Sequence, residues 1–246
     1  MTPAEVMTTA LTATFLFNNH LDKGREFLLH DKAIPNMLSK SRFNRRLHNI
    51  SDLLWKAFFE WVSKRNLNKN EATQFIVDTF PIEVCHFVRA NRSKIYTEKR
   101  YYGYCASKKR SFYGLKAHVI TDKYGNPFQL VLTPGSYSDI SVLKDLRLKL
   151  PIGSELHGDK GYTSYALEDG LRDCANIRLI VARKSNSKRP HTEEVTVHTR
   201  KIRKRIETTF GQVVNYFGRN IHAVTAAGFQ LKVYMSILVY AMLNCR

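Results

Sequence analysis

The chain has 246 residues, of which 43% are hydrophobic, and this composition excludes a disordered protein. The length suits one large domain, or a small domain beside a medium one, with a core that needs no disulfides. Lys and Arg number 39 against 21 Asp and Glu, a formal net charge of +18. Such an excess of positive charge favours a nucleic-acid partner over a merely well-solvated surface.

The cysteines and the apolar stretches predict a cytoplasmic protein, which in a bacterium would be associated with the nucleoid. Residues 1–18 lack the basic segment of a secretion signal, and the longest apolar stretch, 233–243, is too short to span a bilayer. No C-x-x-C pair occurs, so we expect free thiols in a reducing compartment, not a zinc site: Cys85, Cys105, Cys174 and Cys245.

The N-terminal part predicts helices. Thr2 can cap a first helix, Pro3 suits its first position, and Glu5 completes a capping box. A second helix is predicted over residues 43–61, where apolar residues recur at steps of three and four and should form one buried face: Phe43, Leu47, Ile50, Leu54, Phe58 and Trp61. Residues 1–68 therefore predict a small helical domain, with its boundary in the polar stretch 66–70.

Residues 69–246 predict a second domain of the α/β class. Apolar runs indicate strands at 75–78, 112–121, 128–133, 154–159 and 177–182. Helical spacing indicates helices at 138–150, 165–174, 198–217 and 229–243, and the polar stretch 183–198 is expected to be mobile. The turn at 124–127 makes two strands antiparallel, while the later strand-helix-strand unit should be parallel. The sheet is thus expected to be mixed and flanked by helices.

Three acids stand where a metal site could form. Asp78 and Asp159 each end a predicted strand, and Glu207 lies in the basic helix. Transfer of a phosphodiester needs an activated oxygen and a neutralised leaving oxygen, which two Mg²⁺ ions supply, and hard cations prefer carboxylate oxygens. Taken singly, the acids have plainer roles: a turn cap at Asp78, an Asx-turn at Asp159, and an ion pair with Arg203 for Glu207.

Five motifs together carry a resemblance to a known family. They are IVDTFP at 76–81, YGLKAH at 113–118, LTPGSYSD at 132–139, GDKGY at 158–162 and R-x-x-I-E-x-x-F at 203–210. Their order and spacing resemble one group of insertion-sequence transposases, which have a DDE catalytic domain on an RNase H-like fold. The segment SRFNRRL at 41–47 resembles the same group, so the resemblance covers nearly the whole chain.

The resemblance implies a transposase that cleaves transposon ends and transfers the strands into target DNA. It implies that Asp78, Asp159 and Glu207 bind two Mg²⁺ or Mn²⁺ ions, that double-stranded terminal inverted repeats and target DNA are the partners, and that the protein acts as a homodimer on DNA. It also implies further helical residues before Met1. Some relatives have Tyr and Lys where this chain has Arg200 and Val214, whereas Arg203 is retained.

The basic, tyrosine-rich stretch 89–110 is expected to be a loop over the site. Its cations would contact phosphates and its tyrosines would stack on unpaired bases, although a solvated loop is the alternative. The helical domain 1–68 is expected to bind the transposon end. The candidate DNA contacts are Lys99, Arg100, Lys108, Lys109, Lys116, His118, Arg203, Arg42, Arg45 and Arg46.

Some assignments keep alternatives at this point. Asp139 reads as part of a helix start or as a fourth carboxylate, Asp122 as a turn residue, and His118 as a site residue or a half-exposed strand residue. The same metal site would also serve a nuclease of RNase H-like fold that stops at hydrolysis. A non-enzymatic alternative is an inactive transposase remnant that binds DNA as a regulator.

Overall fold

The computed structural model describes residues 1–106, 109–217 and 220–244. Its contacts divide the chain into two compact units, one of Leu67–Phe210 and one of Met1–Asn66 with Gly211–Arg246. The N-terminal boundary lies close to the predicted one at 68/69. The C-terminal residues, which we predicted as part of the second domain, are grouped with the N-terminal helices instead. The assignment of 1–68 and 69–246 to DNA-end binding and catalysis stays a prediction.

The first unit consists of helices. They are α1 (Pro3–Phe17), α2 (Leu21–His30), α3 (Lys40–His48), most of α4 (Asp52–Asn70), the 3-10 turn η4 (Asn215–Phe217) and α8 (Ala226–Leu243). The predicted capping box begins α1: the Glu5 amide donates to Thr2 Oγ1 at 3.2 Å, and the Thr2 amide donates to Glu5 Oε2 at 2.6 Å. The α1 helix therefore starts where the sequence predicted.

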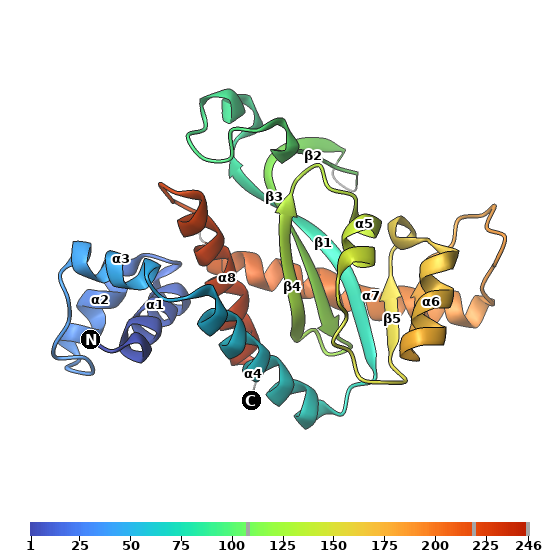
Figure 1. The fold of residues 1–246 in the computed structure, drawn as a ribbon, viewed down its shortest axis with the longest axis horizontal. Coiled ribbons are helices and arrows are strands. Elements are labelled where there is room, and N and C mark those ends of the chain that lie inside the picture. Colours follow the sequence, from blue (N-terminus) through green and yellow to red (C-terminus); the bar gives the residue numbers. More distant parts are fainter. Residues whose placement is uncertain (107–108, 218–219, 245–246) are drawn as a thin grey trace. The chain divides into compact units, whose positions relative to one another are not determined.

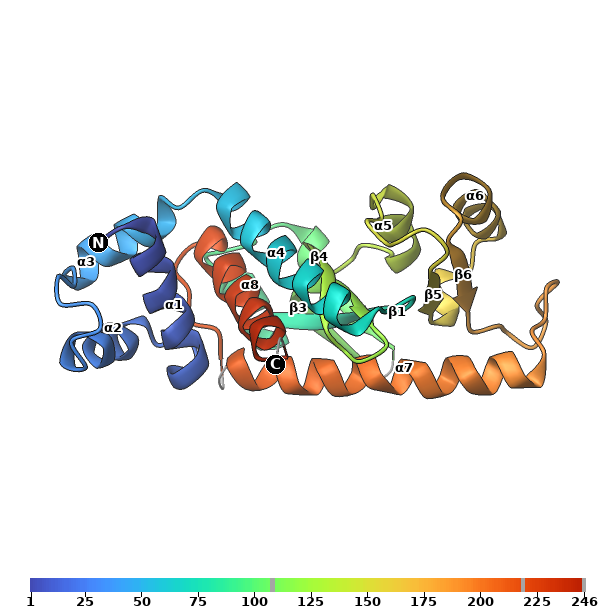
Figure 2. The same cartoon turned by 90° about the horizontal axis from the view of Figure 1, so that it is seen from below.

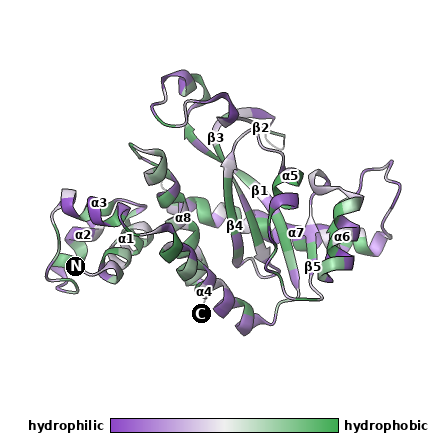
Figure 3. Cartoon of the chain, in the orientation of Figure 1, coloured by the Kyte–Doolittle hydropathy of each residue, from purple (hydrophilic) through white to green (hydrophobic). Residues whose placement is uncertain are grey.

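Helix α8 is longer than predicted and begins at Ala226. Its length and composition would suffice to cross a membrane, but over half of it is buried inside the structure. Asn66 Nδ2 donates to the Ala241 carbonyl at 3.0 Å, and the Tyr234 hydroxyl donates to the Trp55 carbonyl at 3.3 Å. These contacts make α8 the core helix of this unit, and Figure 3 shows it among the most hydrophobic elements.

The single helix predicted over 43–61 is wrong, because the structure has two helices there. α3 ends at His48, and Ser51 Oγ accepts the Leu54 amide at 3.2 Å as α4 begins. Because the helix breaks, the apolar face that was predicted to continue into α4 is not buried throughout: Leu54 is 44% and Trp61 56% exposed. The predicted boundary 66–70 lies within the last turns of α4. The residues buried in α4 are Trp55, Phe59, Val62, Ser63 and Asn66.

The second unit is built on a mixed sheet (Figure 1). The strand order is β2-β3-β1-β5-β6, and β4 also pairs with β3. β3 is antiparallel to β1, β2 and β4, whereas β5 is parallel to β1 and β6. This confirms the predicted α/β class and is consistent with an RNase H-like fold. The strands are β1 (Gln74–Cys85), β2 (Tyr102–Cys105), β3 (Arg110–Asp122), β4 (Pro127–Pro134), β5 (Glu155–Gly158) and β6 (Arg178–Val181).

Helices cover both faces of this sheet (Figure 2). α5 (Asp139–Asp145) and α6 (Tyr165–Ala175) lie over a core that includes Phe75, Val77, Leu156 and Leu179. α7 (Glu193–Val214) runs along the opposite face, where the Phe210 ring lies 4.5 Å from the Phe80 ring. Successive strand residues point to opposite faces, so Asp78, two residues before Phe80, points toward α7. The remaining elements are the 3-10 turns η1 (Phe87–Arg92), η2 (Lys99–Tyr101) and η3 (Lys160–Tyr162).

The turn between β3 and β4 is organised by Asp122, as predicted. Its Oδ1 accepts the backbone amides of Tyr124 and Asn126, both at 2.9 Å. Cys85 and Cys174 are free thiols, as expected, and Cys245 lies outside the described residues.

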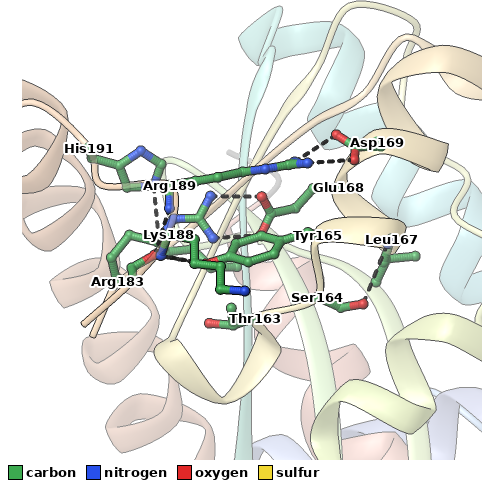
Figure 4. Close-up of polar contacts among 12 residues, drawn as sticks. Thr163, Ser164, Tyr165, Leu167, Glu168, Asp169, Arg183, Lys188, Arg189 and His191 are labelled. Carbon is green, nitrogen blue, oxygen red and sulfur yellow. Dashed lines mark hydrogen bonds and ion pairs between the residues drawn. The ribbon is translucent and has the colours of Figure 1, made fainter. Parts of the chain in front are cut away.

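Residues 183–198, expected to be mobile, are tied to α6 by the contacts in Figure 4. Arg183 donates to both carboxylate oxygens of Glu168 at 2.7 Å, and these side chains are only 10% and 9% exposed. Arg183 and Arg189 each lie over the Tyr165 ring, at 5.4 and 4.8 Å from its centroid. Helix α7 also begins at Glu193, earlier than predicted. Charged residues of a stretch that was expected to be mobile therefore form specific contacts with α6.

The described residues of the stretch 89–110, namely 89–106 with 109 and 110, form more regular structure than the predicted loop. β2 pairs with β3. Tyr96 is 7% exposed, and its ring centroid lies 4.6 Å from that of Tyr101. Tyr102 packs on Tyr113 at 4.8 Å. Three of the tyrosines expected to stack on bases thus contact other aromatic rings of the protein, and Tyr104, at 60% exposure, is the one open to solvent.

Candidate active site

The parallel pairing of β1 with β5 brings Asp78 and Asp159 together. Ile76 pairs with His157. Asp78 lies two residues after Ile76, and Asp159 lies two residues after His157. The two acids therefore occupy matching positions on the same side of the sheet, on strands that are spaced about 4.8 Å apart. Asp159 comes directly after the last residue of β5. β1 continues past Asp78 to Cys85, beyond the predicted end of that strand. Asp78 therefore lies within β1, Asp159 lies just beyond the carboxyl end of β5, and both carboxylates face α7.

Arg203 on α7 lies between these two acids. Its Nη2 is 3.6 Å from Asp78 Oδ2, and its Nη1 is 3.3 Å from Asp159 Oδ1. The Arg203 side chain is 19% exposed, and its Nε is buried and has no hydrogen-bond partner among the residues that the structure describes. Two half-buried carboxylates need a positive charge between them, and the guanidinium supplies it. A hard divalent cation would satisfy the same pair of carboxylates, so the residues fit a metal.

Burial dominates the electrostatics of Asp78. It raises the pKa of the Asp78 carboxyl to about 6, with the negative charges of Asp159 and Asp139 acting in the same direction. The Thr79 amide, which donates to Asp78 Oδ1 at 2.8 Å, and the Arg203 charge oppose that rise. Asp78 is thus an acid whose charged form lacks full compensation, and a bound cation would provide it.

Asp139 and Tyr162 lie near the same acids. Lys116 Nζ donates to Asp139 Oδ1 at 3.0 Å and to the Tyr137 carbonyl at 2.9 Å, so Asp139 is first of all an ion-pair partner. Ser138 is the N-cap residue of α5, but its side chain makes no capping hydrogen bond. Tyr162 is buried, and its pKa is raised well above the usual value by that burial and then by nearby acids, Asp139 and Asp78 among them. We had not singled out Tyr162, although it belongs to the GDKGY motif.

Glu207 stands one helical turn beyond Arg203 on the same side of α7, about 6 Å along the axis. Its side chain is exposed and makes no hydrogen bond or ion pair with any residue in the described parts of the chain. The Arg203–Glu207 pair weighed from the sequence does not form, because Arg203 contacts the two aspartates instead. The convergence of Glu207 with Asp78 and Asp159 stays a prediction.

The candidate DNA contacts fall into different environments. Lys99, Arg100 and Lys109 are exposed, as are Arg42, Arg45 and Arg46 on α3. Lys108 lies outside the described residues. Lys116 is paired with Asp139, and Arg203 with the two aspartates. His118 is 5% exposed, with Nε2 2.8 Å from Thr133 Oγ1, so the structure gives no support to a DNA contact there.

His118 should instead make stability depend on pH. Burial lowers the pKa of its ring to about 4, against the opposing charge of Asp139 and in the same direction as Lys116. The unfolded chain takes up the proton near pH 6.5 and the folded chain only near 4, so this contribution is present above pH 6.5 and lost as pH falls toward 4. His118→Gln should therefore show a shallower fall in unfolding free energy between pH 6.5 and 4.5, by up to about 1.4 kcal/mol per pH unit. Urea titrations at several pH values measure it, and equal slopes would contradict the buried neutral ring.

Comparison with known proteins agrees with the predicted family. The sequence profile of the transposase DDE domain matches residues 69–242. The chain belongs to the transposase DDE-domain family. Members of this family generally use divalent metal ions in nuclease-type chemistry on DNA. The candidate acids of this transposase-family chain, Asp78, Asp159 and Glu207, all lie within the matched residues.

One curated relative of this transposase-family chain is the transposase for insertion sequence element IS1106 of Neisseria meningitidis serogroup B. It is 32% identical over 115 residues, which cover 45% of this chain and 40% of the relative. The match thus spans less than half of the relative's length. No solved structure matches the chain.

Proposed function

We propose that this chain is the DNA transposase of an insertion sequence, which cleaves the ends of its element and joins them to target DNA. The observation that carries the proposal is the pair Asp78 and Asp159, which come from the adjacent parallel strands β1 and β5 and are bridged by Arg203, within a domain of the transposase family. Two half-buried carboxylates side by side with one guanidinium between them are poorly explained by stability alone, because the single positive charge does not balance both acids.

Each residue of the site has a proposed role. Asp78, Asp159 and Glu207 would hold two Mg²⁺ or Mn²⁺ ions. Such ions would neutralise charge on the phosphodiester and activate an oxygen nucleophile. Arg203 holds the two aspartates in place, and its guanidinium also offers a contact for a phosphate of the bound strand.

A surface hollow of about 570 Å³ indicates the side of the domain from which we propose that DNA approaches. Its lining includes Tyr104, Lys116, Asp139 and Gly161. The hollow shares Asp139, whose charge acts on Asp78 in the same direction as that of Asp159, with the surroundings of the proposed site. The exposed cations Lys99 and Arg100 lie in the segment just before β2, whose Tyr104 lines the hollow. We therefore propose that double-stranded DNA binds across this surface. We also propose that the protein acts as a cytoplasmic homodimer, which brings two transposon ends together.

Strand joining distinguishes this function from its alternatives. We expect inverted repeats to bracket the gene, and a labelled duplex ending in them should be cleaved and its 3′ end covalently joined to a supercoiled plasmid in Mg²⁺. The joined product on a gel is the measurement, with a duplex of scrambled ends as the control. Cleavage without joining would indicate a nuclease, and a band shift without cleavage would indicate a DNA-binding remnant.

A further inference from the structure

A second set of ligand groups lies apart from the proposed catalytic acids, where α7 crosses β5. Glu155 and His157 are two residues apart on β5, so both point to the face that α7 covers. His198 comes from the second turn of α7. One ligand atom from each of these three residues lies within 4.8 Å of the other two. The catalytic function proposed above uses none of the three.

His157 is held as a metal ligand would be. It is fully buried, and its Nδ1 lies 3.3 Å from Thr199 Oγ1. In the tautomer that carries its proton on Nδ1, the ring donates to that hydroxyl and leaves a lone pair on Nε2, which lies 3.4 Å from Glu155 Oε2. This Nε2 is buried and forms no hydrogen bond in the described parts of the chain. A buried ring nitrogen left unsatisfied is unfavourable, and a metal ion would satisfy it.

The other two ligands are oriented by one amide. Gln74 Nε2 donates to Glu155 Oε2 at 3.0 Å and lies 3.2 Å from His198 Nε2. An amide nitrogen only donates, so His198 accepts through the lone pair on Nε2, and a zinc ion bound there would replace the amide as the partner of that lone pair. The second carboxylate oxygen of Glu155 accepts from Arg178, whose side chain is 66% exposed and free to turn away.

We propose that Glu155, His157 and His198 bind one Zn²⁺ ion, with water as the fourth ligand. Two imidazoles and one carboxylate suit Zn²⁺, whereas Mg²⁺ prefers an all-oxygen shell. Zinc bonds of about 2.0–2.2 Å at tetrahedral angles place two ligand atoms roughly 3.4 Å apart, so the widest pair in this group must close by up to about 1.4 Å. Rotation of the exposed His198 side chain supplies that closure. The ion fastens the start of α7, which later carries Arg203 and Glu207, to the strand that leads to Asp159.

The test is a zinc titration of the full chain against a chromogenic zinc indicator, with excess Mg²⁺ to fill carboxylate sites. Wild type should bind one Zn²⁺ that both His198→Ala and Glu155→Gln lose. The affinity loss should exceed the 10–100-fold that outer-shell changes produce, and Thr199→Val should fall within that range. The controls are His222→Ala, an exposed histidine in the other unit, and Asp159→Asn, and both should bind as wild type.

Thermal unfolding provides a second measurement that does not depend on the indicator. Zinc should raise the Tm of wild type and His222→Ala but leave that of His198→Ala unchanged, because only a folded site gains from the ligand. The proposal is overturned if wild type binds no zinc at micromolar concentrations, or if His198→Ala binds it as tightly as wild type. It is also overturned if Asp159→Asn loses the zinc, because the ion would then occupy the carboxylate pair.

Discussion

Asp159→Asn should lower the rate of DNA strand cleavage by roughly three orders of magnitude while leaving DNA binding intact or slightly tighter. The amide keeps the size of the side chain but removes the charge that a divalent ion needs. Removing negative charge beside Arg203 also leaves that guanidinium freer to contact a phosphate. The measurement pairs single-turnover cleavage of a labelled end duplex with a binding titration on the same duplex.

The matched control for this change is Asp173→Asn on α6, whose carboxylate is 65% exposed and pairs with Arg172. It removes the same charge from the same unit at a surface position, so cleavage should be nearly unchanged. If Asp159→Asn lost binding and cleavage together, Asp159 would be a structural residue and the assignment of the pair would fail.

Neutralising Lys99, Arg100, Lys108 and Lys109 together should flatten the dependence of log affinity on log salt by roughly two to four units. Each phosphate contact on duplex DNA contributes about −0.9 to that slope. Lys99 and Arg100 are exposed in η2, and Lys109 is exposed just before β3. Arg100 pairs with Glu98 at 2.8 Å, an exposed pair that leaves it available to a phosphate. Between 50 and 200 mM salt, this change should appear as a much smaller loss of affinity in the variant.

The comparison variant neutralises Arg42, Arg45 and Arg46 on α3. It should change the slope less, although it should reduce the preference for transposon ends over random DNA. Both variants need circular dichroism to show that their helices are intact. A larger change of slope in the α3 variant would mean that the helical unit is the main DNA contact and that residues 89–110 are a solvated segment.

The sequence predicted the parts of the fold that depend on local pattern. The apolar runs before Asp78 and Asp159 became β1 and β5, and the capping box of Thr2 and Glu5 formed as expected. The break between α3 and α4 does not follow from the pattern, because leucines and aromatics continue one helical period across Ser51, even though Ser51 Oγ can cap the start of a new helix. The pairing of α8 with α4 depends on contacts such as Asn66 to Ala241, which no local pattern reveals.

The proximity of Asp78 and Asp159 in the candidate site was predictable, whereas their surroundings were not. Spacing and motif order indicated Asp78 and Asp159, and strand register then placed them side by side. The bridging position of Arg203 was not predicted, because the sequence suggested Glu207 as its partner. In the sequence, His157 is simply the residue before the GDKGY motif. Its surroundings depend on Thr199 and His198, which are distant in the chain.

The central claim is that Asp159 and Glu207 act as metal ligands, and a change of metal preference tests it most directly. Asp159→Cys and Glu207→Cys should each lose cleavage in Mg²⁺, which binds thiolate poorly, and should regain part of it in Mn²⁺, which accepts softer ligands. The measurement is the cleavage rate of an end duplex in each metal, relative to wild type in the same metal. Selective rescue by Mn²⁺ at both positions is the result we predict. Variants that fold and bind DNA but remain equally inactive in both metals, or that cleave normally in Mg²⁺, would contradict it.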